Sequence, residues 1–166
     1  HIQHPTRGRI LFALHPFQEK VLRLFRDHQY VITLKSRQLG ISTLASAYAL
    51  WLMIFHKDKN VLALATTQAT ARNLVSKTIF MYDQLPKWLR LPHVEKNKLS
   101  LRLKNGSKIQ AKSSNTDAAR SEAVSLLLID EAAFIDNIDE TFTAAQQTLA
   151  TGGQCMALST PNGIGN

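Results

Sequence analysis

Two adjacent carboxylates follow a strongly apolar run in the second half of the chain. Residues 126–129 are Leu-Leu-Leu-Ile, and Asp130 and Glu131 come directly after them. Burying unpaired carboxylates is costly, so a buried strand that ends in two acids indicates a metal or another partner at its end. This is the Walker B arrangement, in which Asp130 would hold hydrated Mg²⁺ and Glu131 would orient and deprotonate the attacking water. The alternative makes Glu131 an ordinary helix N-terminal acid favoured by the helix dipole.

Residues 35–43 read Lys-Ser-Arg-Gln-Leu-Gly-Ile-Ser-Thr and could form a phosphate-binding loop. Such a loop directs backbone N–H groups toward phosphate at a helix N-terminus. The usual pattern, G-x-x-x-x-G-K-[ST], has its first glycine replaced by Lys35 and its lysine by Ile41. A cation near the transferred phosphoryl group would then come first from Lys35 and second from Arg37, while the Ser42 hydroxyl would ligate Mg²⁺. An ordinary strand-to-helix turn is the alternative.

The nucleotide contacts predicted within this loop involve Ser36, Gln38, Leu39, Gly40, Ile41, Ser42 and Thr43. Thr160 and Asn162 follow the last predicted strand and could sense the γ-phosphate, because ligands of α/β sheets bind at strand ends. A plain turn around Pro161 is the alternative. Arg120 lies in a segment of small residues and could be either an arginine finger or a surface salt-bridge partner.

These segments are placed by a regular alternation of predicted strands and helices. Short apolar runs predict strands, and longer amphipathic or apolar segments predict helices. Strands are expected at 30–34, 61–66, 125–129 and 154–158, and helices at 17–28, 41–56, 68–84 and about 140–149. A hairpin is expected from strands 99–103 and 108–112 around Asn105-Gly106. The fold class is therefore α/β, with a mostly parallel sheet flanked by helices and an antiparallel hairpin insertion.

Residues 1–14 are expected to be an extended lead-in, followed by a single domain over residues 15–166. Helix 41–56 is apolar on nearly every face and should be covered by its neighbours. The outward side chains of the hairpin form a basic face that could follow a phosphate backbone or simply be solvated. This set is Ser100, Arg102, Lys104, Lys108, Gln110 and Lys112.

Composition favours a polyanionic partner and excludes several site classes. The chain carries 20 Lys and Arg against 12 Asp and Glu, a net charge of +8 with a pI near 9.9, which favours nucleic acid, although scattered charge can also serve solubility alone. Cys155 is the only cysteine, so no internal disulfide or Cys-based zinc site forms, and a reducing compartment fits best. The apolar stretch 44–55 is too short for a bilayer, so no membrane contact is expected.

Four segments together resemble one protein family. Residues 15–18 (His-Pro-Phe-Gln), 36–40 (Ser-Arg-Gln-Leu-Gly), 128–134 (Leu-Ile-Asp-Glu-Ala-Ala-Phe) and 159–163 (Ser-Thr-Pro-Asn-Gly) resemble the ATPase domain of the large terminase subunit, the DNA-packaging motor of tailed bacteriophages. The resemblance extends over about residues 15–166.

The resemblance implies roles for individual residues. Gln18 would recognise adenine, and Thr160 and Asn162 would belong to the motif that couples hydrolysis to movement. Arg120 aligns with an arginine that the family can use as a finger. Lys35 stands where some terminases place the lysine that others carry at the position of Ile41.

The resemblance also implies a P-loop NTPase fold of the additional-strand type. The chain would use ATP and Mg²⁺ to drive double-stranded DNA into a procapsid. It would work as a homo-oligomeric ring on the portal protein, together with the small terminase subunit, in the host cytoplasm, and would be monomeric in isolation. No nuclease activity is expected of these 166 residues. Two alternatives remain, a helicase-like DNA translocase and a non-catalytic nucleotide-binding module that lacks the lysine at Ile41.

Overall fold

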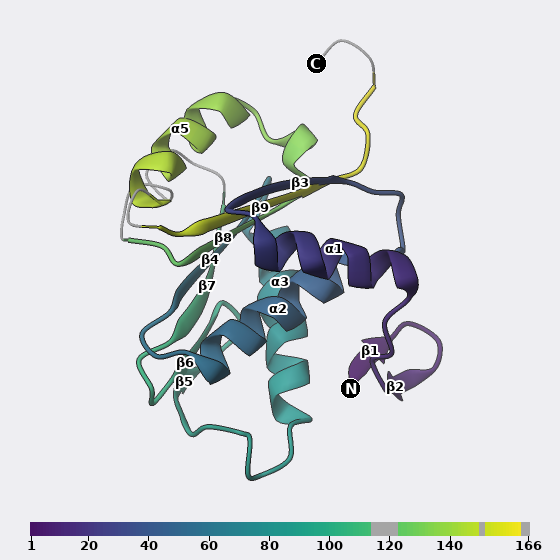
Figure 1. Ribbon diagram of the computed structural model, residues 1–166, viewed down its shortest axis with the longest axis vertical. Coiled ribbons are helices and arrows are strands. Elements are labelled where there is room, and N and C mark those ends of the chain that lie inside the picture. Colours follow the sequence, from purple (N-terminus) through teal and green to yellow (C-terminus); the bar gives the residue numbers. More distant parts are fainter. Residues whose placement is uncertain (114–122, 150–151, 164–166) are drawn as a thin grey trace.

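A mostly parallel sheet forms the centre of the protein (Figure 1). The structure is a computed structural model that describes residues 1–113, 123–149 and 152–163. Within these residues the sheet has seven strands in the order β3-β9-β8-β4-β7-β6-β5. Neighbours from β3 to β7 are parallel, whereas β6 is antiparallel to β7 and β5 is antiparallel to β6. The predicted parallel sheet with an antiparallel insertion is thus confirmed. The strand bounds are β3 Tyr30–Leu34, β4 Asn60–Ala65, β5 His93–Lys96, β6 Ser100–Leu103, β7 Lys108–Ser113, β8 Leu126–Asp130 and β9 Gln154–Ser159.

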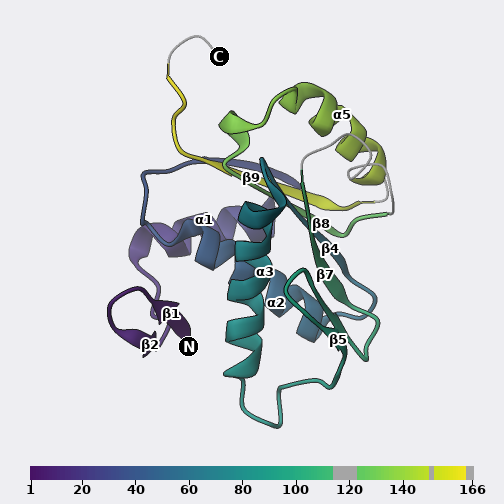
Figure 2. The same cartoon turned by 180° about the vertical axis from the view of Figure 1, so that it is seen from behind.

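Helices cover both faces of this sheet. Helices α1 (Pro16–Asp27), α2 (Ile41–Phe55) and α3 (Gln68–Asp83) lie on one side, and α5 (Ile138–Leu149) lies on the other, as Figure 2 shows from behind. Successive side chains of a strand point to opposite faces. Accordingly Leu126 and Leu128 join the core beneath α1, α2 and α3, while Leu127 and Ile129 join the core beneath α5. Burial on both faces explains why β8 has no polar residue before Asp130.

The sequence predicted these long elements to within one or two residues of their ends, but it missed others. Residues 1–14 are extended as expected, yet they contain an unpredicted antiparallel hairpin of β1 (Ile2–His4) and β2 (Gly8–Ile10). Ile2 packs on the core, and Arg9 Nη1 donates to Gln84 Oε1 at 2.9 Å, so this segment is attached to the end of α3. Strand β5 was also not predicted.

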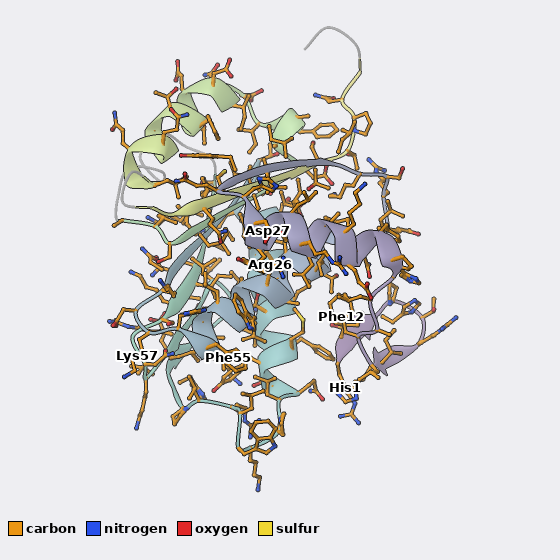
Figure 3. The ribbon with its side chains drawn as sticks, viewed as in Figure 1. His1, Phe12, Arg26, Asp27, Phe55 and Lys57 are labelled. Carbon is orange, nitrogen blue, oxygen red and sulfur yellow. The ribbon has the colours of Figure 1, made fainter. Side chains whose placement is uncertain are left out.

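Two expectations about exposure were wrong. Ser100, expected to face outward on the hairpin, is buried because its hydroxyl donates to the Glu95 carboxylate on the neighbouring strand. Helix α2 was expected to be covered on nearly every face, but Trp51 is 43% exposed and Phe55 60% exposed. Figure 3 shows Phe55 at the end of α2, on the side of the molecule that also carries Phe12 of the N-terminal segment. Among the described residues, no helix is both long and apolar enough to cross a membrane.

Candidate functional site

Three predicted motifs meet at one edge of the sheet. Strands β3, β8 and β9 are parallel neighbours, so their carboxyl ends lie side by side. Leu34 pairs with Ser159, and Asp130 pairs with Leu158. The backbone N–H of Lys35 donates to the Ser159 carbonyl at 2.9 Å, which fixes the start of the loop against the end of β9. Residues far apart in the sequence therefore form one local cluster.

Lys35 lies between the two acids of the Walker B segment. Its Nζ is 3.0 Å from Glu131 Oε1 and 3.7 Å from Asp130 Oδ1. The Lys35 side chain is only 8% exposed, so this is a largely buried charge cluster. Arg37, the second predicted cation, is exposed, and its guanidinium has no hydrogen bond or ion pair within the described parts of the chain. The geometry therefore brings Lys35, rather than Arg37, to the carboxylates.

Asp130 gathers donors on a single oxygen. The Ser42 hydroxyl donates to Asp130 Oδ1 at 3.1 Å, and the Glu131 backbone N–H donates to the same oxygen at 3.2 Å. Asp130 itself is buried at the end of β8. No group of three or more His, Cys, Asp or Glu side chains suited to a metal occurs among the described residues. A hydroxyl beside one carboxylate suits Mg²⁺, which is usually held by few protein ligands together with waters and phosphates.

Glu131 is held by both of its carboxylate oxygens. Thr160 donates to Oε2 through its hydroxyl at 2.8 Å and through its backbone N–H at 3.0 Å, while Lys35 occupies Oε1. Burial alone would raise the pKa of Glu131, but the Thr160 and Lys35 hydrogen bonds together bring this pKa below its ordinary value. Glu131 also adopts a left-handed backbone, with φ of 54°, a conformation that is costly for a residue with a side chain. Glu131 is therefore an ionised, positioned carboxylate.

The loop before α2 has the backbone of an anion-binding turn. Gln38 and Gly40 both have positive φ, 64° and 72°. The first hydrogen bond of α2 runs from the Leu44 N–H to the Gly40 carbonyl at 2.9 Å, so the N–H groups before Leu44 lack an acceptor in the helix. Ile41 is only 2% exposed and packs in the core. At this position only the backbone N–H can serve a ligand.

Gln18 supports this loop from α1. Its side chain is buried, Nε2 donates to the Leu39 carbonyl at 2.9 Å, and Oε1 accepts from the His15 N–H at 3.0 Å. A Cβ added to Gly40 would lie 2.8 Å from Gln18 Nε2, so glycine is required here for space as well as for its positive φ. The structure thus joins Gln18 to the loop, and adenine recognition by Gln18 stays a prediction.

The remaining predicted residues lie near this cluster or outside the described residues. Asn162 Nδ2 donates to the Ala133 carbonyl at 2.8 Å, and the Ala133 N–H donates to Ser159 Oγ at 3.0 Å. The segments that follow β8 and β9 are therefore tied together. Thr43 lies in the first turn of α2, and Ser36 is exposed in the loop. Arg120 lies outside the described residues.

Sequence reasoning missed Lys77, on α3. Burial lowers the pKa of its ammonium, Asp130 opposes that shift, and Lys35 adds to it, so Lys77 lies within electrostatic reach of both site residues. Its spacing contained a usable signal. Lys77 lies three residues after Leu74 and four before Met81, both buried, which places it on the inward face of the helix.

Comparison with known proteins agrees with this geometry. The family model described as "Terminase large subunit, T4likevirus-type, N-terminal" matches residues 32–164. The chain belongs to this family of large terminase subunits. The predicted relationship to phage large terminases is therefore confirmed, and so is the fold of their ATPase domains.

Solved large terminases have the same fold. A variant of the ATPase domain of the Thermus phage P74-26 large terminase has a TM-score of 0.76 at 22% identity, with 93% of this chain and 68% of that chain covered. The HK97 bacteriophage large terminase has a TM-score of 0.71 at 18% identity, covering 96% of this chain and 35% of that protein. A large terminase of a thermophilic bacteriophage in complex with ADP has a TM-score of 0.64 at 16% identity, covering 87% and 38%. The same thermophilic phage protein is also known in complex with ATP-γ-S. The chain therefore spans little more than a third of the longer proteins it matches.

Proposed function

We propose that this chain binds ATP with Mg²⁺ at the carboxyl edge of β3, β8 and β9 and hydrolyses it. The observation that carries the proposal is the Glu131 carboxylate, held between Lys35 and Thr160 beside the Ser42–Asp130 pair. The complexes of a structurally similar terminase with ADP and ATP-γ-S support nucleotide binding at this fold.

The residues of the site have separate tasks in this proposal. The free N–H groups at the start of α2 bind phosphate oxygens, aided by the helix dipole. Ser42 and Asp130 hold Mg²⁺, which neutralises charge on the phosphate oxygens. Lys35 stabilises the negative charge that spreads over the transferred phosphoryl group. Glu131 orients the attacking water and takes its proton.

Thr160 links this chemistry to the end of β9. Glu131 Oε2 accepts two hydrogen bonds from Thr160, so a proton taken up by the carboxylate weakens the hold of Glu131 on that segment. Asn162 lies two residues further and bonds to Ala133, next to the Walker B segment. We propose that this connection carries the signal of hydrolysis to the parts of the motor that move DNA.

In the assembled motor the chain would translocate double-stranded DNA into a procapsid. The proposed partners are DNA, the portal protein and the small terminase subunit, with several copies in a ring on the portal in the host cytoplasm. The net charge of +8 is compatible with a DNA partner. Portal-dependent packaging of DNA by the complete protein would support this assignment, and strand separation without packaging would favour a helicase-like translocase.

ATP turnover and ATP binding, measured side by side, test the chemical part. Glu131→Gln keeps the size of the side chain but removes its basicity, so turnover should fall about 10²–10⁴-fold while ATP still binds. Glu140→Gln, an exposed acid on α5, is the matched control and should keep full turnover. Lys35→Ala should lose turnover, whereas Arg37→Ala should retain most of it.

Two results would contradict the proposal. Full turnover by Glu131→Gln would remove the proposed base. If the unmodified chain binds ATP but does not hydrolyse it, even at concentrations that allow assembly and with its partners present, it is a non-catalytic nucleotide-binding module.

A further inference from the structure

A polar hollow opens beside the phosphate-binding loop, between the N-terminal hairpin and helices α2 and α3. Its volume is about 270 Å³. Thr43 contributes to its wall and directly follows Ser42, the residue that bonds to Asp130. Lys77 forms part of the opposite wall on α3. The hollow therefore adjoins the flank of the proposed nucleotide site.

The packing of α3 against α2 fixes the position of Lys77. Ser46 Oγ donates to the Leu74 carbonyl at 3.3 Å, and Thr78 Oγ1 is 3.5 Å from the Ser46 carbonyl. Thr43 lies about one helical turn before Ser46, toward the N-terminus of α2. Lys77 directly precedes Thr78, so its side chain starts at this helix contact and is partly buried there.

The charge around Lys77 comes from the site itself. The charged groups that act on its ammonium are Asp130 and Lys35. Within the part of the chain that the structure describes, no acceptor lies within hydrogen-bonding distance of the Lys77 ammonium. A partly buried ammonium without an acceptor is costly, because three N–H donors have lost water. An anionic ligand at the adjacent phosphate loop would supply the missing acceptor.

The phosphate loop has a matching deficit. Ile41 stands where the usual lysine would reach the phosphates, and its side chain is buried in the core. Lys35 is already engaged by Glu131 and Asp130, and Arg37 is exposed. ATP carries more negative charge than one Mg²⁺ neutralises, so a second ammonium near the loop has a clear electrostatic use.

We infer that Lys77 is a phosphate-binding residue of the nucleotide site, supplying from α3 the ammonium that the loop lacks at Ile41. This inference rests on the proposed ATP site. Lys77 extends past Thr43 and donates to a phosphate oxygen of the bound nucleotide. A competing role is purely structural, in which Lys77 only offsets the charge of Asp130 in the folded protein.

Nucleotide affinity separates these roles. The dissociation constants of a non-hydrolysable ATP analogue, ADP and AMP would be measured with Mg²⁺ by calorimetry for the unmodified chain, Lys77→Met and Lys77→Arg. Loss of a charge-assisted hydrogen bond should raise the dissociation constant of the ATP analogue about tenfold or more. The effect should be smaller for ADP and absent for AMP, and Lys77→Arg should restore most of the affinity. Arg72→Met, at an exposed cation on the same helix, is the matched control and should change nothing.

Each outcome decides the inference. Unchanged affinity in Lys77→Met overturns it, and so does an equal loss for all three nucleotides, which indicates a structural role. If the unmodified chain binds none of them, the proposed ATP site fails and the inference fails with it. If the unmodified chain binds and Lys77→Met binds equally well, only the inference fails.

A second measurement does not depend on the folding of Lys77→Met. The lysines of the unmodified chain would be labelled with carbon-13 methyl groups, and the Lys77 signal identified by its loss in Lys77→Arg. A shift of this signal on addition of the ATP analogue, but not of AMP, supports phosphate contact. A signal that does not move with either nucleotide overturns it.

Discussion

Strands β3 and β9 are built from different interactions at their two ends. At the amino end, neutral hydrogen bonds hold the strands together. The Cys155 N–H donates to the Gln29 carbonyl at 2.8 Å, and the Gln29 side chain donates to the Gly153 carbonyl at 3.0 Å. At the carboxyl end, where β8 joins them, a buried lysine faces two carboxylates, one of them on a left-handed backbone.

This difference separates stability from chemistry along the same strands. Neutral, fully paired groups at the amino end cost little to bury and fix the register of the sheet. Charged and strained groups at the carboxyl end cost stability but leave a carboxylate positioned for reaction. Substitutions at the amino end should therefore affect folding without altering the site, and most of those at the carboxyl end should affect ligand chemistry.

The largest expected effect is that of Lys35→Met at the charged end. This change leaves Asp130 and Glu131 side by side without the cation that lies between them. The free energy of unfolding at neutral pH should fall by about 3 kcal/mol, the lower end for a broken buried pair because Glu131 keeps some contact with solvent. Denaturant unfolding followed by circular dichroism measures this loss.

Arg37→Met is the matched control for Lys35→Met. It removes one cation from the same loop, but the Arg37 side chain is exposed. Its unfolding free energy should change by no more than about 0.5 kcal/mol. Equal losses in the two variants would show that the acids do not depend on Lys35 in particular.

The next largest effect is expected at the neutral end, from Gly153→Ala. A Cβ at this position would overlap the Val124 carbonyl oxygen and would lie 2.7 Å from Leu149 Cδ2. Because backbone must move to admit it, the unfolding free energy should fall by about 2–3 kcal/mol. The dissociation constant for ATP, measured on folded protein, should stay unchanged.

Gly152→Ala separates crowding from backbone strain. Gly152 has φ of 96°, with open space around its added Cβ, so only strain opposes the substitution. Its cost should be about 1 kcal/mol. If either variant weakens ATP binding as strongly as it weakens folding, the two ends of the strands are not independent.

The sequence predicted the scaffold better than the site, for physical reasons. Runs such as Leu126–Asp130 carry strand structure in their own residue pattern, and parallel strands bring their carboxyl ends together whatever the details. The three-residue strands β1 and β2 are too short to show a period, and β5 is exposed along its whole length, so it shows no apolar alternation.

Within the site, residue types were predictable but their contacts were not. The sequence offered both Lys35 and Arg37 as cations, and only the path of the chain after β3 decides which one reaches Glu131. The dependence of the loop on Gln18, and the position of Lys77 near Asp130, come from packing between helices distant in sequence. Such contacts depend on tertiary structure, which local spacing does not specify.

A smaller effect is expected from Gln18→Leu, which removes the support of the phosphate loop. The Leu39 carbonyl and the His15 N–H each lose a partner. The unfolding free energy should fall by about 1–2 kcal/mol, and ATP should bind more weakly because the loop is less firmly held. Gln18→Glu keeps the acceptor for His15 but loses the donor to Leu39, so it should weaken ATP binding at least as much. Unchanged ATP affinity in both variants would mean that the loop keeps its shape without Gln18.

The smallest effect is expected from Thr67→Ala, just beyond the carboxyl end of β4. This strand end lies at the same edge of the sheet but carries an ordinary helix cap, in which Thr67 Oγ1 accepts from the Thr70 N–H at 3.2 Å. Loss of the cap should cost about 0.5–1 kcal/mol of unfolding free energy, and Thr67→Ser should recover it. ATP turnover should stay at the level of the unmodified chain, because no charged group of the site contacts this cap among the described residues. A drop in turnover would extend the reactive edge from β3, β8 and β9 to β4 and would redraw the boundary between scaffold and site.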